Sequence, residues 1–169
     1  MLVAETTNIK HNPSTPEALC RHIVSMFEWE DFETVLEPAR GTGNFWRAIP
    51  SNVCRDWCEI QEGRDFFQYD KRCDTIITNP PFREEINGVR VNMVTRFLEH
   101  SMEIADKRII FLMKMFVSLT PLRLSRYQAN GWNMTRLKVF NIRAWFGRFS
   151  LVVFEKNKPS IIEWSTQSW

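Results

Sequence analysis

Short apolar segments alternate with segments of helical periodicity along this 169-residue chain. Strands that alternate with helices favour an α/β fold with a mostly parallel sheet and helices on both faces. We predict helices at residues 16–27, 44–49, 93–105 and 121–128, and a loop at 83–92. Two predicted strands follow each other directly near the end, which indicates an antiparallel hairpin that completes the sheet. The predicted strands are 34–36, 56–60, 66–69, 74–78, 108–115, 137–142 and 150–155.

The composition is that of an ordinary globular domain. Hydrophobic residues make up 44% and charged residues 25% of the chain, which is too apolar for a disordered protein and sufficient for a full core. We expect a single domain over residues 1–169, with no segment that spans a bilayer and no signal-peptide pattern, and hence a cytoplasmic location. The cysteines lack CxxC spacing, so no metal site is expected. They are Cys20, Cys54, Cys58 and Cys73.

Charge is distributed unevenly, although the net charge is only +2. Acidic residues outnumber basic ones as far as Asp106, and no acidic residue occurs between Lys107 and Phe154. Tryptophan and phenylalanine are interleaved with the basic residues there. Two interpretations remain, namely a solvated basic face and a surface that binds a polyanion such as nucleic acid. The basic residues are Lys107, Arg108, Lys114, Arg123, Arg126, Arg136, Lys138, Arg143 and Arg148.

A glycine turn follows the first predicted strand, in the segment from Glu37 to Gly43 (EPARGTG). The ligand crevice of an open α/β sheet lies at the carboxyl ends of its strands, and glycine lets a ligand approach the backbone closely. The segment lacks the third glycine and the lysine of phosphate-binding loops. The Glu37 carboxylate instead suits a cationic ligand, such as the ammonium of a methionine group. An ordinary turn at a helix N-terminus is the alternative.

Two acidic residues follow at positions that suit the rest of a nucleoside-type ligand. Glu59 ends the second predicted strand, where an acid accepts hydrogen bonds from ribose hydroxyls in nucleotide-binding sheets. Asp65 is placed to accept an amino proton from the adenine of a cofactor, with Phe66 packed on its ring. A surface acid near a strand end is the alternative interpretation of Glu59.

The Asn79-Pro80-Pro81-Phe82 sequence directly follows a buried apolar strand and is the strongest chemical signal. Two prolines fix the backbone and present carbonyl oxygens in defined directions. The Asn79 side-chain oxygen and the Pro80 carbonyl are placed to accept both protons of one planar amine, which aims its lone pair at an electrophilic methyl group. Phe82 offers a face on which an extruded base can stack. A proline-rich strand exit without chemistry is the alternative.

Together these motifs resemble the amino-methyltransferases that modify adenine in DNA, with the glycine motif before the catalytic motif. Residues 13–19 (PSTPEAL) are similar to the segment that covers the methionine end of the cofactor in that family. The C-terminal half is similar to small phage-type methyltransferases, which implies the host cytoplasm if the chain is phage-encoded. The resemblance implies a Rossmann-like class I methyltransferase with a seven-stranded sheet and with catalysis at residues 79–82. The implied S-adenosylmethionine-binding residues are Thr15, Pro16, Glu37, Pro38, Ala39, Gly41, Gly43, Phe45, Glu59, Ile60, Asp65, Phe66 and Asn79.

The resemblance implies adenine in DNA as the substrate and leaves alternatives open. No separate target-recognition domain fits, so sequence readout would fall to residues 83–92, to the basic C-terminal half, or to a partner, either a second copy or a specificity subunit. The same catalytic motif occurs in methyltransferases of guanine amines in RNA and of protein glutamine. An inactive subunit of the same fold is a further alternative, which a crevice filled by Arg40 or Trp46 would favour. The candidate nucleic-acid contacts are Arg83, Arg90, Lys114, Arg123, Arg126, Arg143 and Arg148.

Overall fold

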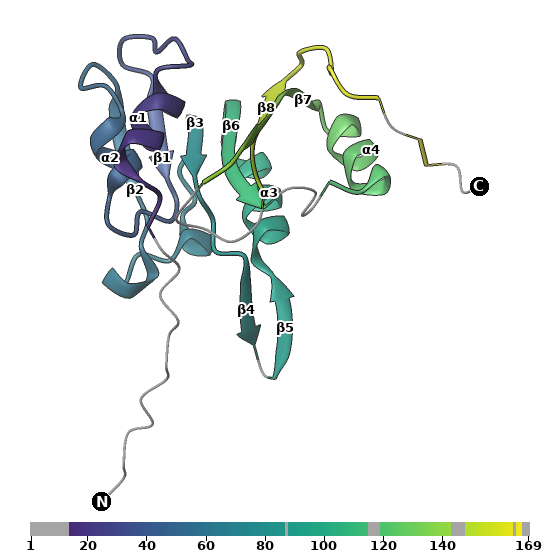
Figure 1. Cartoon of the computed structure of the whole chain (residues 1–169), viewed down its shortest axis with the longest axis horizontal. Coiled ribbons are helices and arrows are strands. Elements are labelled where there is room, and N and C mark those ends of the chain that lie inside the picture. Colours follow the sequence, from purple (N-terminus) through teal and green to yellow (C-terminus); the bar gives the residue numbers. More distant parts are fainter. Residues whose placement is uncertain (1–13, 87, 115–118, 143–147, 164, 167–169) are drawn as a thin grey trace, which may run out of the picture.

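The computed structural model describes residues 14–86, 88–114, 119–142, 148–163 and 165–166. The main strands are β1 (Thr34–Glu37), β2 (Cys54–Trp57), β3 (Cys73–Thr78), β6 (Ala105–Lys114), β7 (Trp132–Phe140) and β8 (Phe149–Lys156). They form a six-stranded sheet in the order β2-β1-β3-β6-β8-β7 (Figure 1). Strands β1, β2, β3 and β6 run parallel to one another, and β8 runs antiparallel to both of its neighbours. The expected mostly parallel sheet with a C-terminal antiparallel hairpin is therefore confirmed.

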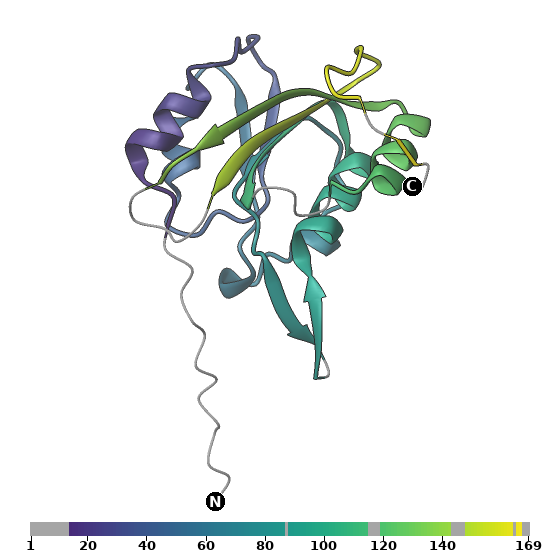
Figure 2. The ribbon, with the colours of Figure 1, turned by 45° about the vertical axis from the view of Figure 1, so that its right-hand side comes forward.

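Helices cover both faces of the sheet (Figure 2). They are α1 (Glu17–Val24) and α2 (Asn44–Ala48) on one face, and α3 (Met93–Ile104) and α4 (Pro121–Ala129) on the other. Along β6, successive side chains alternate between the two faces of the sheet. Ile109 and Phe111 belong to the core on the α3 and α4 side, whereas Ile110 and Leu112 belong to the core on the opposite face. None of the helices in these ranges is long and apolar enough to cross a membrane.

The sheet has six strands in the described part of the chain, where the resemblance implies seven. The prediction of a strand at residues 66–69 is wrong, because this segment forms the 3-10 helix η2 (Phe66–Gln68). The Asp65 carboxylate accepts a hydrogen bond from the Phe67 N–H at 2.9 Å, and such a local bond competes with strand pairing. The buried Phe66 ring packs on Phe97, with ring centroids 4.8 Å apart, which holds the turn in place.

Residues 83–92 form a two-stranded hairpin and not the predicted loop. Strands β4 (Arg83–Ile86) and β5 (Val89–Asn92) pair antiparallel, and no third described strand joins them. The sequence places an Asn-Gly pair between the two strands, which is the strongest short-range signal for a tight hairpin. The hairpin projects from the body of the molecule at the edge where the parallel strands end (Figure 1).

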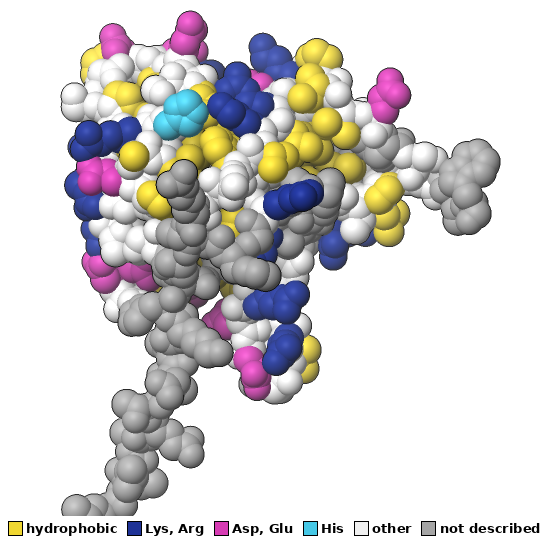
Figure 3. All heavy atoms as spheres, in the orientation of Figure 1, with side chains coloured by type: hydrophobic (Ala, Val, Ile, Leu, Met, Phe, Trp, Pro, Cys, Tyr) yellow, Lys and Arg dark blue, Asp and Glu magenta, His cyan; other side chains and the backbone are white. Residues whose placement is uncertain are grey.

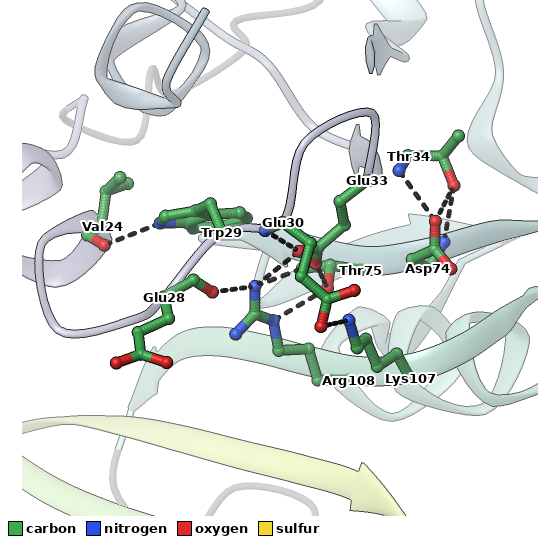
Figure 4. A network of polar contacts seen from close by, with 10 residues as sticks. All are labelled: Val24, Glu28, Trp29, Glu30, Glu33, Thr34, Asp74, Thr75, Lys107 and Arg108. Carbon is green, nitrogen blue, oxygen red and sulfur yellow. Dashed lines mark hydrogen bonds and ion pairs between the residues drawn. The ribbon is translucent and has the colours of Figure 1, made fainter. Parts of the chain in front are cut away.

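A buried polar network joins the amino-terminal ends of β1, β3 and β6 (Figure 4). The Arg108 guanidinium donates to the Glu33 carboxylate and to the Thr75 hydroxyl, both at 2.9 Å. It also donates to the Glu28 carbonyl at 2.9 Å, and its Cζ atom lies 4.6 Å from the Trp29 ring centroid. A buried charge is tolerated when it is paired and hydrogen-bonded, so Arg108 belongs to the fold and not to a basic binding surface.

Thr75→Val is expected to lower the free energy of unfolding by about 2 kcal/mol, because it removes a buried hydroxyl that both donates and accepts. That hydroxyl donates to Glu33 at 2.5 Å and accepts from Arg108 at 2.9 Å. Thr34→Val is the matched control, since the Thr34 hydroxyl bonds Asp74 in an exposed position and should contribute only about 0.5 kcal/mol. Urea unfolding measures both variants, and equal losses would contradict the role assigned to the buried network.

Candidate functional site

Three turns meet at the end of the sheet where the carboxyl ends of the parallel strands lie. The glycine turn follows β1 and Glu59 follows β2. The turn of residues 79–82, which is predicted to be catalytic and is called the catalytic turn below, follows β3. Since β1 pairs in parallel with both β2 and β3, the carboxyl ends of these strands lie side by side. Ligands of open α/β sheets bind in the crevice at this end of the sheet. The structure thus brings the three predicted motifs to one place.

The backbone of the glycine turn is open to an approaching ligand. Gly41 and Gly43 have φ angles of 50° and 77°, in the left-handed region that favours glycine. A Cβ atom added to Gly41 would meet no heavy atom within 4 Å, so space remains beside the main chain there. Gly43 is more enclosed, because its Cβ would lie 3.3 Å from the Arg47 guanidinium.

Glu37 places a carboxyl group at the floor of this turn, out of reach of solvent. The residue is 2% exposed, and its Oε2 atom has no hydrogen-bond partner among the described residues. Burial raises the pKa of this carboxyl to about 8, against smaller lowering effects of the Trp46 backbone N–H and of the Arg40 and Arg47 guanidinium groups. A buried, unpartnered acceptor is costly for a fold, so its presence indicates a ligand that supplies a cation or a donor.

Glu59 supports the glycine turn with one of its carboxylate oxygens. Strand β2 ends at Trp57 and not at the predicted residue 60, so Glu59 becomes the N-cap of the 3-10 helix η1 (Ile60–Glu62). The Glu59 Oε2 atom accepts from the Gly41 N–H at 2.7 Å. Ile60 is 67% exposed beside it and presents an apolar surface that a planar ring can cover.

Several residues that the resemblance assigns to the cofactor have their side chains in the core or at helix caps. Phe66 is 2% exposed and packs on His100 at a centroid distance of 4.7 Å, so it does not offer the expected face to an adenine. Phe45, which belongs to α2, is 2% exposed and also packs in the core. Pro16 is the N-cap of α1, and Asp65 is the N-cap of η2. Pro38 and Ala39 begin the glycine turn.

The Asn79 side chain is anchored at its nitrogen and unpartnered at its oxygen. Nδ2 donates to the Thr15 hydroxyl at 3.2 Å, whereas Oδ1 is buried without a hydrogen-bond partner among the described residues. The Thr15 carbonyl accepts from Asn44 Nδ2 at 2.6 Å, which ties the segment before α1 to the start of α2. Buried polar atoms are normally satisfied, so an oriented amide oxygen without a donor indicates a ligand donor such as an amine.

Phe82 ends the catalytic turn between two neighbouring elements. Its ring centroid lies 5.9 Å from that of Phe149 and 5.6 Å from the Lys114 ammonium, and its carbonyl accepts from the Met93 N–H at 3.3 Å. Pro80 is buried beside it, so the turn is rigid. Lys114 ends β6, and it therefore brings a cation to the aromatic ring of the catalytic turn.

Three of the candidate nucleic-acid contacts lie near this turn, and a fourth lies on the hairpin that follows it. Arg83 follows Phe82 directly, Arg90 lies on β5, and Arg148 precedes the residue of β8 that pairs with Lys114. None of the four forms an ion pair within the described ranges. Unpaired cations near a ligand crevice attract anionic groups.

The other basic residues of the acid-free stretch lie elsewhere. Arg123 and Arg126 are on α4, and Arg126 lines a hollow of about 500 Å³ with Trp132, at the opposite edge of the sheet. Lys107 pairs with Glu30 at 2.6 Å and is therefore not a free cation. Arg143 lies outside the described residues. The described part of the basic stretch is therefore divided, because Lys107, Arg108 and Arg126 do not face the candidate site.

Sequence reasoning missed Asn44, whose contact with Thr15 is described above. A short polar residue after a glycine turn is common, so nothing in the sequence marks this one.

Arg40, which would favour an inactive subunit if it filled the crevice, instead lies 3.8 Å from the Trp57 ring centroid and pairs with Glu62. In the described ranges no group of three or more His, Cys, Asp or Glu side chains could hold a metal ion.

Comparison with known proteins agrees with this geometry at the level of the fold. No family model and no curated protein matches the sequence. A protein of Listeria monocytogenes described as a class I S-adenosylmethionine-dependent methyltransferase matches with a TM-score of 0.66 and 11% identity, over 89% of this chain and 62% of that chain. A protein of Vibrio vulnificus YJ016 described as a modification subunit of a type I restriction enzyme matches with a TM-score of 0.61 and 17% identity, over 91% and 46%.

A third solved structure contains a ligand. It is the magnesium protoporphyrin IX methyltransferase ChlM of Synechocystis PCC 6803 with bound S-adenosylmethionine, with a TM-score of 0.58 and 11% identity over 83% of this chain and 77% of that chain. The chain spans less than two thirds of the length of the first two structures. Identities this low establish the fold alone. The described residues therefore have the fold of class I S-adenosylmethionine-dependent methyltransferases.

Proposed function

We propose that this chain is an S-adenosylmethionine-dependent methyltransferase that modifies an exocyclic amine of nucleic acid, with the N6 amine of adenine in DNA as the leading substrate. The observation that carries the proposal is the buried, unpartnered Oδ1 atom of Asn79 at the end of β3. That acceptor directly precedes a Pro-Pro pair, which holds its carbonyls rigidly. Fixed acceptors of this kind suit an amine whose lone pair has to be localised.

The glycine turn and its neighbours fit the cofactor. A methionine ammonium needs an acceptor, and Glu37 offers a buried Oε2 atom without a partner among the described residues. Ribose hydroxyls need a carboxylate after the second strand, which Glu59 offers, and the exposed Ile60 side chain offers apolar cover for an adenine. Gly41 leaves room for close approach to the main chain. When bound, S-adenosylmethionine supplies an electrophilic methyl group.

The catalytic turn acts on the target amine by orientation. Asn79 Oδ1 and the Pro80 carbonyl each accept one amine proton, which directs the nitrogen lone pair out of the ring plane. Positioning and fixed dipoles then lower the barrier without a strong general base. The methyl group would pass from the sulfonium sulfur of the cofactor to this nitrogen, with the S–C bond breaking as the N–C bond forms, and a neutral thioether would remain. The methylated nitrogen would then be acidic and would release one proton to solvent along a hydrogen bond that it already makes. Phe82 stacks on the extruded base.

The unpaired cations around the turn favour nucleic acid over protein as the substrate. Each of the four described above can neutralise one phosphate, and four such contacts should make DNA affinity fall about 100-fold between 50 and 200 mM salt. Fluorescence anisotropy with a labelled duplex measures this dependence. A salt-independent affinity would show that these cations form only a solvated face.

Calorimetric titration with S-adenosylmethionine, followed by tritium-methyl transfer to mixed DNA and RNA, tests the proposed function. Binding followed by transfer to DNA is the expected result. Transfer to RNA alone would replace the substrate, and binding without any transfer to nucleic acid would point to protein glutamine or to an inactive subunit. Absence of binding would refute the cofactor assignment.

Glu59→Ala is expected to weaken S-adenosylmethionine binding by about 1–3 kcal/mol, the usual contribution of hydrogen bonds to a charged acceptor. The variant also releases the Gly41 N–H from its bond to Glu59. Glu62→Ala is the matched control, because it removes the same charge three residues away from an exposed side chain that pairs with Arg40. Calorimetry measures both affinities, and an unchanged value for Glu59→Ala would mean that the ribose is held elsewhere.

A further inference from the structure

We propose that the β4–β5 hairpin reads DNA sequence beside the target adenine by entering the major groove of the duplex. This inference rests on the proposed function and adds to it the element that sets site preference. The proposed ligand of the hairpin is duplex DNA. The experiment below distinguishes it from single-stranded nucleic acid and from RNA.

The hairpin is held rigidly at the catalytic turn by both of its ends. Its first residue, Arg83, follows Phe82 directly, and the Phe82 carbonyl accepts from the Met93 N–H at 3.3 Å. Its last residue, Asn92, caps α3 by accepting from the Thr95 N–H at 3.2 Å. A base held by the catalytic turn would therefore have its flanking nucleotides next to the hairpin.

The two faces of the hairpin differ in what they contact. Side chains of directly opposite residues share a face, so Arg83, Glu85 and Arg90 lie on one face, and Glu84 and Val91 lie on the other. Val91 is half-buried and packs against the main core, whereas the three residues of the first face are exposed. The hairpin is thus attached to the body by one face and presents the other outward.

The outward face carries side chains of the types that read base edges. Arginine pairs with guanine O6 and N7, and glutamate accepts from cytosine N4, in the major groove of DNA. Glu85 and Arg90 lie opposite each other but form no ion pair in the described structure, so both are available to a ligand. Figure 3 shows basic side chains on the projecting hairpin.

The dimensions of the hairpin match the DNA groove. Four residues per strand give a length of about 13 Å, and a two-stranded ribbon fits a major groove about 12 Å wide. The major groove of A-form RNA is too narrow for side chains to read. At the tip, a Cβ atom added to Gly88 would meet nothing within 4 Å, and Val89 is 63% exposed. An isolated two-stranded hairpin is marginal in water, and contacts with a duplex would stabilise it.

Glu85→Gln and Arg90→Gln test the inference on the whole chain. The substrate is a pool of duplexes in which the bases flanking one adenine are randomised, and methylated products are sequenced. We expect each variant to change the preference at a flanking position and to lower kcat/KM on the preferred duplex by about 5- to 150-fold, the effect of losing one base contact. Affinity for S-adenosylmethionine, measured by calorimetry, should stay within about twofold, which also verifies folding.

Two controls carry the same charge changes away from the outward face. Glu84→Gln changes the opposite face of the hairpin, and Lys158→Gln changes an exposed position beyond β8. Both should keep the wild-type preference. Unchanged preference in Glu85→Gln and Arg90→Gln, or methylation of single strands or RNA but not of duplexes, would overturn this inference and leave the methyltransferase assignment intact. A wild-type protein that methylates no nucleic acid would instead overturn the proposed substrate, and this inference with it.

Discussion

Asn79→Ala is expected to lower the rate of methyl transfer by about 100- to 1000-fold, the scale at which a single fixed hydrogen-bonding group contributes to a transition state. The alanine side chain removes the buried Oδ1 atom that has no partner among the described residues and that we assign to the target amine. Since the proposed ammonium and ribose contacts are made by Glu37 and Glu59, the affinity for S-adenosylmethionine should change by less than about threefold, within the range of a lost neutral hydrogen bond. Single-turnover methyl transfer and calorimetry measure the two quantities separately.

Thr15→Val is the matched control for this variant. The amide of Asn79 donates to the Thr15 hydroxyl at 3.2 Å, so Asn79→Ala removes this bond as well as the acceptor. Thr15→Val removes the same bond and leaves Oδ1 in place, and it should slow transfer by only about tenfold through looser orientation of the amide, as expected for one neutral hydrogen bond. Equal losses in the two variants would mean that Asn79 acts by holding the segment before α1, and the assigned catalytic role would be wrong.

The order of strands and helices could be predicted because each central strand carries its own signal. Residues 109–112 are apolar throughout and are buried on both faces, which is the pattern of a central parallel strand covered by helices. The Glu37 and Asn79 motifs could be located for a related reason. Glu37 is the last residue of such a strand and Asn79 directly follows one, and the carboxyl ends of neighbouring parallel strands lie side by side.

The incorrect predictions concern segments whose structure depends on contacts that the local sequence pattern does not reveal. Residues 66–69 are apolar enough for a strand, but the Asp65 carboxylate caps Phe67 and the Phe66 ring packs on α3. Residues 83–92 are polar enough for a loop, but β4 and β5 pair with each other, as the Asn-Gly pair in the sequence favours. Arg108 belongs to the basic stretch in the sequence, and its burial could not be predicted because its partner Glu33 lies 75 residues away.

Glu37→Gln is expected to stabilise the ligand-free protein at alkaline pH while weakening cofactor binding. Burial raises the pKa of the Glu37 carboxyl from its ordinary value of 4.5 to about 8. An acid with a raised pKa in the folded state binds its proton more tightly there than in the unfolded chain, so stability is lost as pH rises from 4.5 to 8. Glutamine does not titrate, and the variant escapes this loss. At 1.36 kcal/mol per pKa unit, the gain should approach about 5 kcal/mol above pH 8.

Urea unfolding of both proteins at pH values from 5 to 8.5 measures the predicted gain. The difference in the free energy of unfolding should be smallest at pH 5, where about 1 kcal/mol is expected, and should grow steadily with pH. Glu62→Gln is the control, since Glu62 is exposed on the surface and the variant should show no such growth. A difference that stays constant across this range would show that burial does not hold the proton on Glu37.

Cofactor binding gives the second half of the same prediction. If the Glu37 carboxyl accepts the ammonium of S-adenosylmethionine, glutamine loses a charge-assisted hydrogen bond, and the affinity should fall by at least about tenfold. The ammonium of the bound cofactor would also favour the ionised form of the Glu37 carboxyl. Binding to the wild-type protein near pH 7 should therefore release a proton from Glu37. Calorimetry in buffers of different ionisation enthalpy detects that proton, and Glu37→Gln should bind without releasing it. Equal proton release from both proteins would place the ammonium away from Glu37, because no other group changes between them.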